Sequence, residues 1–136
     1  MCALILALLE SDENSSQVVE SLKRSGHDVI TSNNFTGAID ILKNKHPALV
    51  ISDVHLENGG NVFDFLRWVN DNPPTGEIPF VMFSSRPTAT AKYLEDGVRT
   101  TARMLGAAMY ITMDKFDSDD FRKRIDSLLP ENSQDD

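Results

Sequence analysis

Acidic, hydroxyl and basic side chains follow several apolar runs of this sequence, where they could act together. Glu10 and Asp12 come after the first run, Asp53 after the third, Ser84 after the fourth, and Lys115 after the fifth. Carboxylates held close together repel one another and draw in a cation. A carboxylate can also attack a phosphoryl donor as a nucleophile. Either chemistry requires a fold that brings the ends of these runs together.

The runs have the length and apolar character of strands buried on both faces. The predicted strands span residues 3–9, 27–31, 48–52, 78–83 and 110–112. Between and after them, apolar residues recur at helical spacing. The predicted helices run from a cap at Ser15 or Ser16 to Gly26, from 35 to 42 with Pro47 closing the element, and over 62–69, 94–105 and 121–129.

Alternating strands and helices predict an α/β fold, a doubly wound parallel sheet of five strands with helices on both faces. Such a sheet has its working site at the carboxyl ends of the strands, beside a point where the strand order reverses. The polar residues named above stand at those strand ends. The elements fill residues 1–130 as one domain, and the acidic tail 131–136 is expected to be disordered.

The amino-acid composition argues against several classes of function. Lys and Arg total 13 against 21 Asp and Glu, and a net charge of −8 argues against nucleic-acid binding. No apolar run is long enough to cross a bilayer, and the lone Cys2 fits a reducing cytoplasm. A flavin carrier is disfavoured as well, because Glu10, Asp12 and Glu13 would repel a flavin phosphate after the first strand.

Taken in order, these features resemble the response-regulator receiver domain of two-component signalling, the CheY-like family. Ala48–Val54 looks like its phosphoacceptor strand, Ile78–Ser85 like its switch strand, and Gly106-Ala107 through Tyr110 like its fifth strand. The resemblance extends to about Pro130. It implies a flavodoxin-like sheet with the strand order 2-1-3-4-5.

The resemblance also implies a set of roles around one phosphorylation site. Asp53 would accept a phosphoryl group from a histidine kinase or a phosphotransfer protein. Glu10, Asp12 and Asp53, with the backbone carbonyl of His55, would bind Mg²⁺, a cation that favours carboxylates and retained waters.

Three further residues would respond to the phosphoryl group. Ser84 would hydrogen-bond one phosphoryl oxygen, Tyr110 would move inward with it, and Lys115 would neutralise another oxygen. The lysine of the family pattern, three residues past the aromatic one, falls on Met113 instead, so Lys115 requires a bulge to reach the site.

The acids after the first strand also depart from the family's adjacent pair. Counting without gaps puts Leu9 on the first acid and Glu10 on the second, whereas a small shift makes Glu10 and Asp12 the pair. The stretch between Ser84 and Gly106 is longer than in the family, with residues 86–97 looking like an insertion in or before the fourth helix.

Two functional hypotheses follow. In the first, the chain is a stand-alone receiver and a monomer or weak dimer. It catalyses only its own phosphorylation and dephosphorylation, and it signals by binding another protein. The contact surface would be built from Ser84, Tyr110 and residues 86–97, including Tyr93. In the second, the chain is a pseudo-receiver that binds proteins without using phosphate.

Overall fold

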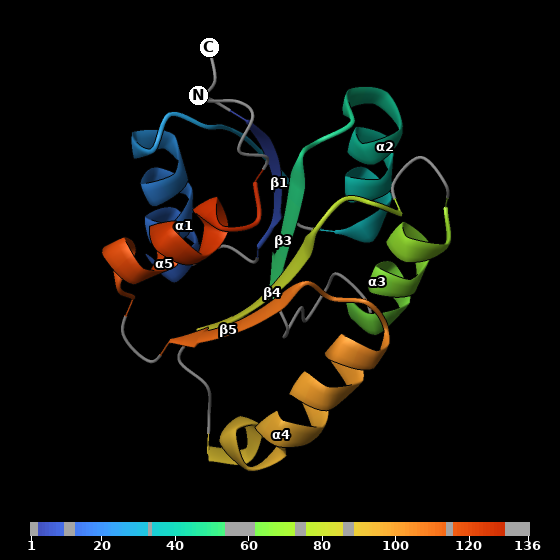
Figure 1. The fold of residues 1–136 in the computed structure, drawn as a ribbon, viewed down its shortest axis with the longest axis vertical. Coiled ribbons are helices and arrows are strands. Elements are labelled where there is room, and N and C mark those ends of the chain that lie inside the picture. Colours follow the sequence, from blue (N-terminus) through green and yellow to red (C-terminus); the bar gives the residue numbers. More distant parts are fainter. Residues whose placement is uncertain are drawn as a thin grey trace.

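The computed structural model describes residues 3–9, 13–32, 34–53, 62–72, 76–85, 89–113 and 116–129, with side chains for all of these except 13–15, 85 and 89–95. Strands and helices alternate along the chain (Figure 1). The strands are β1 Leu4–Leu8, β2 Asp28–Ser32, β3 Leu49–Asp53, β4 Phe80–Ser85 and β5 Met109–Met113. The helices are α1 Glu13–Arg24, α2 Phe35–Lys45, α3 Val62–Asp71, α4 Ala89–Met104 and α5 Ser118–Asp126.

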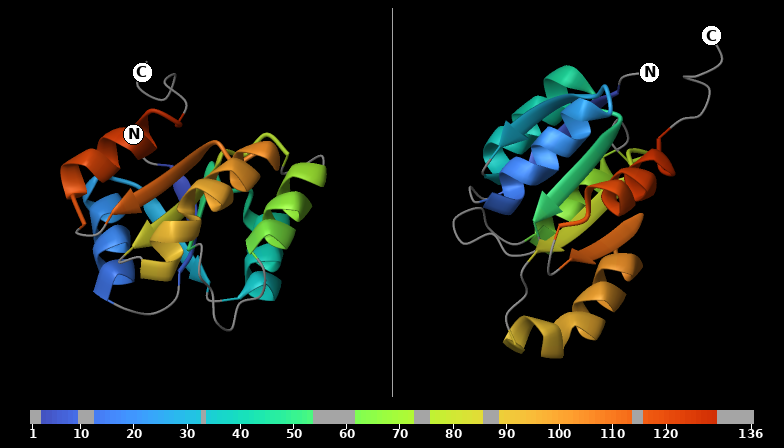
Figure 2. Two further views of the ribbon diagram at one scale, coloured as in Figure 1. Left: turned by 90° about the horizontal axis from the view of Figure 1, so that it is seen from below. Right: turned by 90° about the vertical axis from the view of Figure 1, so that its left-hand side faces the viewer.

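The strands form one parallel sheet in the order β2-β1-β3-β4-β5, as the resemblance implies. The chain leaves β1 toward β2 on one side and later adds β3 on the other, so the order reverses between β1 and β3. All carboxyl ends lie along one edge of the sheet (Figure 2). That edge is the predicted location of the site.

Helices cover both faces of the sheet (Figure 1). A separate apolar layer lies under each set of helices. On one face Val18 and Leu22 of α1 and Phe121 of α5 pack against alternate strand residues. On the other face α2, α3 and α4 pack against the intervening ones. Full burial of each large apolar side chain contributes about 1.5–3 kcal/mol, which is why the strands are apolar on both sides.

The structure corrects several predicted boundaries. α1 begins at Glu13, so Ser15 and Ser16 lie inside the helix and are not its N-cap. α4 begins at Ala89, ahead of the first regularly spaced apolar residue, Leu94. β3 extends through Asp53, which is the last strand residue rather than the first loop residue.

Two predicted helix ends are confirmed by backbone geometry. Gly26 after α1 has a φ of +93°, and Gly106 after α4 has a φ of +105°. Both angles lie in the left-handed region that glycine adopts without steric cost. The end of α4 is also capped from α3, because the side-chain amide of Asn70 donates a hydrogen bond to the carbonyl of Leu105. α5 ends at Asp126, earlier than the predicted 129.

Candidate functional site at the carboxyl edge

Asp53 lies where the sequence predicts a reactive carboxylate. It ends the central strand β3, beside the reversal of strand order, and its side chain is half-buried. The hydroxyl of the fully buried Ser52 donates a hydrogen bond of 3.0 Å to the Asp53 carbonyl oxygen. This bond satisfies a backbone acceptor at the strand end and fixes the peptide that carries the carboxylate. Sequence reasoning assigned no role to Ser52, although a serine inside an apolar strand is a usable signal.

Ser84 lies next to Asp53 on the neighbouring strand. Asp53 pairs with Phe83 across β3 and β4, and Ser84 is the next residue of β4. Ser84 is only 3% exposed and pairs with Thr112 of β5. Because successive side chains of a strand point to opposite faces, Ser84 and Thr112 share the face covered by α4, while Asp53 shares the other face with Phe83. Asp53 and Ser84 can therefore meet a common ligand only over the edge of the sheet.

Apolar side chains occupy the lysine position of the family pattern and, in the count without gaps, its first-acid position. Leu8 pairs with Ser52, so the register places Leu9 level with Asp53 on β3. Leu9 is 7% exposed and Met113 is 8% exposed, and both belong to the apolar layer under α1 and α5. The lysine position, and the first-acid position in the count without gaps, are thus part of the apolar core.

Four predicted site residues lie outside the described part of the chain: Glu10, Asp12, His55 and Lys115. Their roles stay predictions. Within the described ranges, no group of three or more His, Cys, Asp or Glu side chains gathers as a metal site would. Asp53 is a described carboxylate at this edge, and carboxylate oxygen is the kind of hard ligand that Mg²⁺ prefers.

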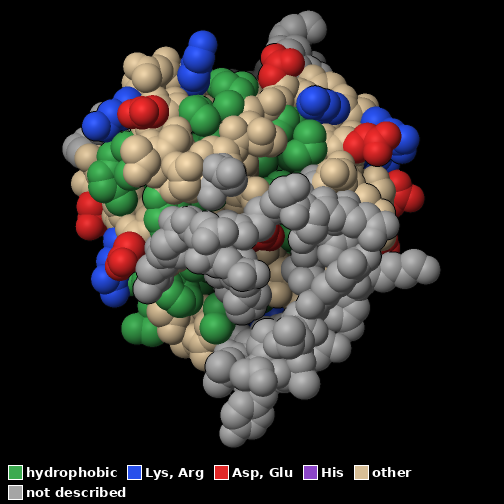
Figure 3. Space-filling model, turned by 180° about the vertical axis from the view of Figure 1, so that it is seen from behind, with side chains coloured by type: hydrophobic (Ala, Val, Ile, Leu, Met, Phe, Trp, Pro, Cys, Tyr) green, Lys and Arg blue, Asp and Glu red, His purple; other side chains and the backbone are tan. Residues whose placement is uncertain are grey.

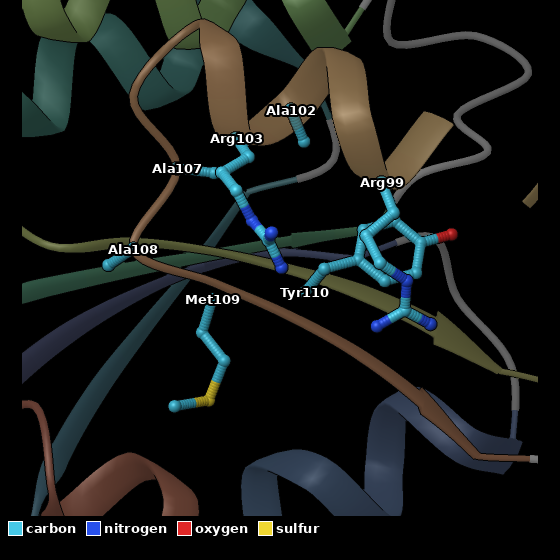
Figure 4. A pocket seen from close by; sticks show the side chains of 7 residues that line it. All are labelled: Arg99, Ala102, Arg103, Ala107, Ala108, Met109 and Tyr110. Atoms are coloured by element: carbon cyan, nitrogen blue, oxygen red, sulfur yellow. The ribbon is translucent and has the colours of Figure 1, made fainter. Parts of the chain in front are cut away.

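Tyr110 is half-buried on β5 and its ring packs against the apolar layer under α4. The guanidinium carbon of Arg99, on α4, lies 4.9 Å from the centre of the Tyr110 ring (Figure 4). This is the geometry of a cation–π interaction. The sequence alone did not point to Arg99, because the contact depends on how α4 packs on β5.

The distribution of charged and apolar side chains on the surface can be compared with what nucleic-acid binding and membrane insertion require. On the face turned away from Figure 1, acidic and basic side chains are interspersed among apolar ones over the described residues (Figure 3). On this face the described residues form no continuous basic patch of the kind that binds nucleic acid. No helix in the described ranges has both the length and the apolar character to span a membrane.

The fold is similar to that of several solved receiver domains. The chemotaxis response regulator CheY4 of Vibrio cholerae is 20% identical with a TM-score of 0.76, and the match covers 95% of this chain and 100% of that chain. NtrX from Brucella abortus is 22% identical with a TM-score of 0.78, covering 95% of this chain and 28% of NtrX. The signal receiver domain of a histidine kinase from Syntrophus aciditrophicus is 20% identical with a TM-score of 0.75, covering 93% and 89%.

No protein-family model and no curated protein matches the sequence. At these identities the likeness shows the fold: a five-stranded receiver-type α/β sheet with the order 2-1-3-4-5.

Proposed function

We propose that this chain is a receiver that accepts a phosphoryl group on Asp53 and transmits its state by binding another protein. The observation that supports this most directly is the placement of a half-buried carboxylate at the end of the central strand, one register step from the buried hydroxyl of Ser84. In a receiver fold this is the edge at which ligands bind.

The chemistry balances with a phosphohistidine donor. A carboxylate oxygen of Asp53 attacks phosphorus, the oxygen–phosphorus bond forms, and the phosphorus–nitrogen bond to the donor breaks, with the nitrogen keeping the electron pair. Bound Mg²⁺ would offset the negative charge shared by the nucleophile and the phosphoryl oxygens. Besides Asp53, we assign its ligands to Glu10, Asp12 and the carbonyl of His55, with Glu10 as the main one.

Ser84 supplies the hydroxyl that would donate a hydrogen bond to the phosphoryl oxygen. Its burial makes that bond more favourable than one at the surface, since the local dielectric is low. Tyr110, on the adjacent strand and under α4, would couple this event to the helix through Arg99. Lys115 would contact another phosphoryl oxygen, because Met113 carries no charge and is buried.

A second candidate function rests on the burial of Leu9 and Met113. With Leu9 and Met113 in the core, two charges of the family pattern are missing, which favours a pseudo-receiver that binds proteins without phosphate. In either case the proposed partners are proteins: a histidine kinase or phosphotransfer protein upstream in the first case, and a downstream target in both. We place the chain in the cytoplasm, acting on no substrate other than itself.

Intact-protein mass spectrometry distinguishes the two functions. The chain is incubated with acetyl phosphate and Mg²⁺, with a matched sample in excess EDTA. The receiver predicts a mass gain of one phosphoryl group that disappears in EDTA. An unchanged mass in both samples, with the protein folded, supports the pseudo-receiver instead.

A further inference from the structure

His27 is a buried titratable side chain at the amino edge of the sheet, opposite the edge that carries Asp53. It follows Gly26 at the end of α1 and precedes β2, and its side chain is 6% exposed. Its backbone amide donates to the Leu22 carbonyl at 3.2 Å, and the Gly26 amide donates to the Lys23 carbonyl at 3.0 Å. These two bonds form a Schellman motif, in which the position of His27 is frequently apolar. An imidazole at this position can change its charge inside the fold.

The two ring nitrogens of His27 face different elements. Nδ1 accepts a hydrogen bond of 3.1 Å from the backbone amide of Ala3, directly before β1. An acceptor nitrogen carries no proton, so the neutral ring has its proton on Nε2. Nε2 lies 3.5 Å from Oδ1 of Asp126, the last residue of α5, and forms no hydrogen bond with any described residue. The ring therefore lies between the start of β1 and the end of α5.

Ala3 is held from two sides by the turn after α1. Its amide donates to the His27 ring, and its carbonyl accepts a hydrogen bond of 2.9 Å from the amide of Asp28. Ala3 is half-buried, so an amide left without an acceptor there is unfavourable. Whether Nδ1 can accept a hydrogen bond therefore affects the start of the pairing between β1 and β2.

α5 is joined to α1 near its start and meets His27 at its end. The hydroxyls of Ser21 on α1 and Ser118 on α5 lie 3.1 Å apart. The two helices cover the same face of the sheet (Figure 1). The Asp126 side chain is 55% exposed, so it can turn toward the ring without disturbing the apolar layer. The end of α5 can therefore respond to the ring while its start stays in place.

The charges around the ring leave Asp126 as its partner. Among the described residues, Asp126 is the acidic side chain within ion-pairing distance of His27. β1 consists of apolar residues. The other charged side chains at this end of the neighbouring elements are exposed: Lys23 and Arg24 on α1, Asp28 on β2, and Lys123 and Arg124 on α5. Arg24 and Arg124 each pair with an acid one turn earlier on their own helix. A positive charge on the buried ring would therefore be compensated chiefly by Asp126.

The two protonation states of the ring favour two different positions. The neutral ring binds the Ala3 amide but leaves the Nε2 proton without an acceptor. An added proton sits on Nδ1, where its N–H points at the donor amide of Ala3. That contact becomes repulsive, while the positively charged ring is attracted to the carboxylate of Asp126.

We propose that His27 is a proton-operated joint between the start of β1 and the end of α5. The unprotonated ring holds the Ala3 amide, and the protonated ring releases it and pairs with Asp126. Imidazole changes its charge between about pH 5 and pH 8, so acidification within that range would operate the joint. The proposal does not depend on phosphorylation of Asp53, since the joint lies at the opposite edge of the sheet.

The test is an NMR titration of the ¹⁵N-labelled chain from about pH 8 to about pH 5. Long-range ¹H–¹⁵N spectra report the protonation of both ring nitrogens, and hydrogen exchange reports the protection of the Ala3 amide. We expect protonation of Nδ1 to accompany an about tenfold loss of that protection, after correction for the pH dependence of intrinsic exchange, because one hydrogen bond is lost. The amides of Ser127 and Leu128, directly after α5, should shift over the same pH range.

Two histidine variants separate the joint from general effects of pH. His27→Asn keeps an acceptor near the position of Nδ1 but cannot take up the proton, so the protection of the Ala3 amide should stay constant across the range. His46→Asn is the matched control. His46 is exposed and has a φ of 51°, in the left-handed region that asparagine also adopts. This variant should respond like the parent.

A third variant tests the connection to α5. In Asp126→Asn the protonated ring has no carboxylate to pair with. The Ala3 amide should still lose its protection on acidification, while the pH-dependent shifts of Ser127 and Leu128 should disappear. Unchanged shifts of these two amides would show that α5 plays no part in the joint.

Three further results would overturn the inference. The ring could stay neutral down to about pH 5, the Ala3 amide could keep its protection while Nδ1 takes up a proton, or the loss of protection could persist in His27→Asn. The titration of the parent chain decides the first two results, so the test does not depend on how well any variant folds.

Discussion

Ser84 stands one residue beyond Phe83, the residue with which Asp53 pairs, so the carboxylate and the hydroxyl end neighbouring strands but belong to opposite faces of the sheet. A ligand held at the edge could contact both side chains. A phosphoryl group on Asp53 could thus change the position of Ser84, and through it the packing of α4, which covers the face of the sheet that Ser84 belongs to.

Removing the Ser84 hydroxyl should separate phosphorylation from the response. Ser84→Ala should still gain a phosphoryl group, because the nucleophile is intact, and its unfolding free energy should change by no more than about 1 kcal/mol. The phosphorylation-induced amide shifts of Tyr110 and α4 should be smaller than in the parent. Ser127→Ala, an exposed control after α5, should respond fully. Undiminished α4 shifts in Ser84→Ala would show that the hydroxyl plays no part.

The acids after β1 should differ in their effect on metal binding. Glu10 belongs to the acid pair in either register, so Glu10→Gln should weaken Mg²⁺ binding more than Asp12→Asn does. The reporter should be the amide shifts of Ser52 and Asp53. The fluorescence of Trp68, the single tryptophan, is less suitable, because Trp68 lies in the second half of α3, far along the helix from the carboxyl edge of the sheet. The reverse order of the two variants would make Asp12 the dominant ligand.

Met113 should behave as a core residue and not as part of the site. Met113→Ala should lower the free energy of unfolding by about 2 kcal/mol, because it leaves a gap beside Phe83 and Phe121. Urea denaturation measures this. The initial rate of phosphorylation should stay within about twofold of the parent, since that rate needs a charge the thioether does not have. A large loss of rate with full stability would contradict the core assignment.

The cap between α3 and α4 predicts non-additive changes in stability. A Cβ at Gly106 would overlap the side-chain amide of Asn70, and its φ of +105° is strained for any other residue. Gly106→Ala should therefore cost about 1–3 kcal/mol. Asn70→Ala should cost about 1 kcal/mol by removing the hydrogen bond to Leu105.

In the Asn70→Ala background, Gly106→Ala should cost less than in the parent, because the overlap is gone and only the backbone strain remains. Urea unfolding of all four proteins completes the cycle. Strictly additive free energies would mean that the two residues do not interact.

The alternation of strands and helices and the place of Asp53 follow from sequence patterns, because the buried strands are continuously apolar and the helices keep regular spacing. The strand order was implied by the resemblance to the receiver family, and the structure confirms it. Element boundaries were less certain where the signal is a single apolar residue. The regularly spaced apolar residues of the fourth helix start at Leu94, yet α4 begins at Ala89, because alanine favours a helix wherever it stands and gives no periodic apolar signal in the sequence. The Arg99–Tyr110 contact could not be predicted, since it depends on how a helix and an edge strand pack in three dimensions.

The burial of Leu9 and Met113 is likewise a property of the packed sheet. The sequence located Met113 at the lysine position and, in one of two registers, Leu9 at the first-acid position, but only the structure places their side chains in the apolar layer under α1 and α5. These two positions are where the proposed phosphoryl chemistry departs most from the resemblance, so they make a direct test of that chemistry necessary.

The central claim is that Asp53 carries the phosphoryl group. The decisive measurement is the intact mass of the parent chain and of Asp53→Asn after incubation with acetyl phosphate and Mg²⁺. This substitution keeps the size of the side chain, but the amide that it introduces cannot form the acyl phosphate. We predict a gain of one phosphoryl group in the parent and none in the variant. Equal labelling of the two proteins would contradict the account.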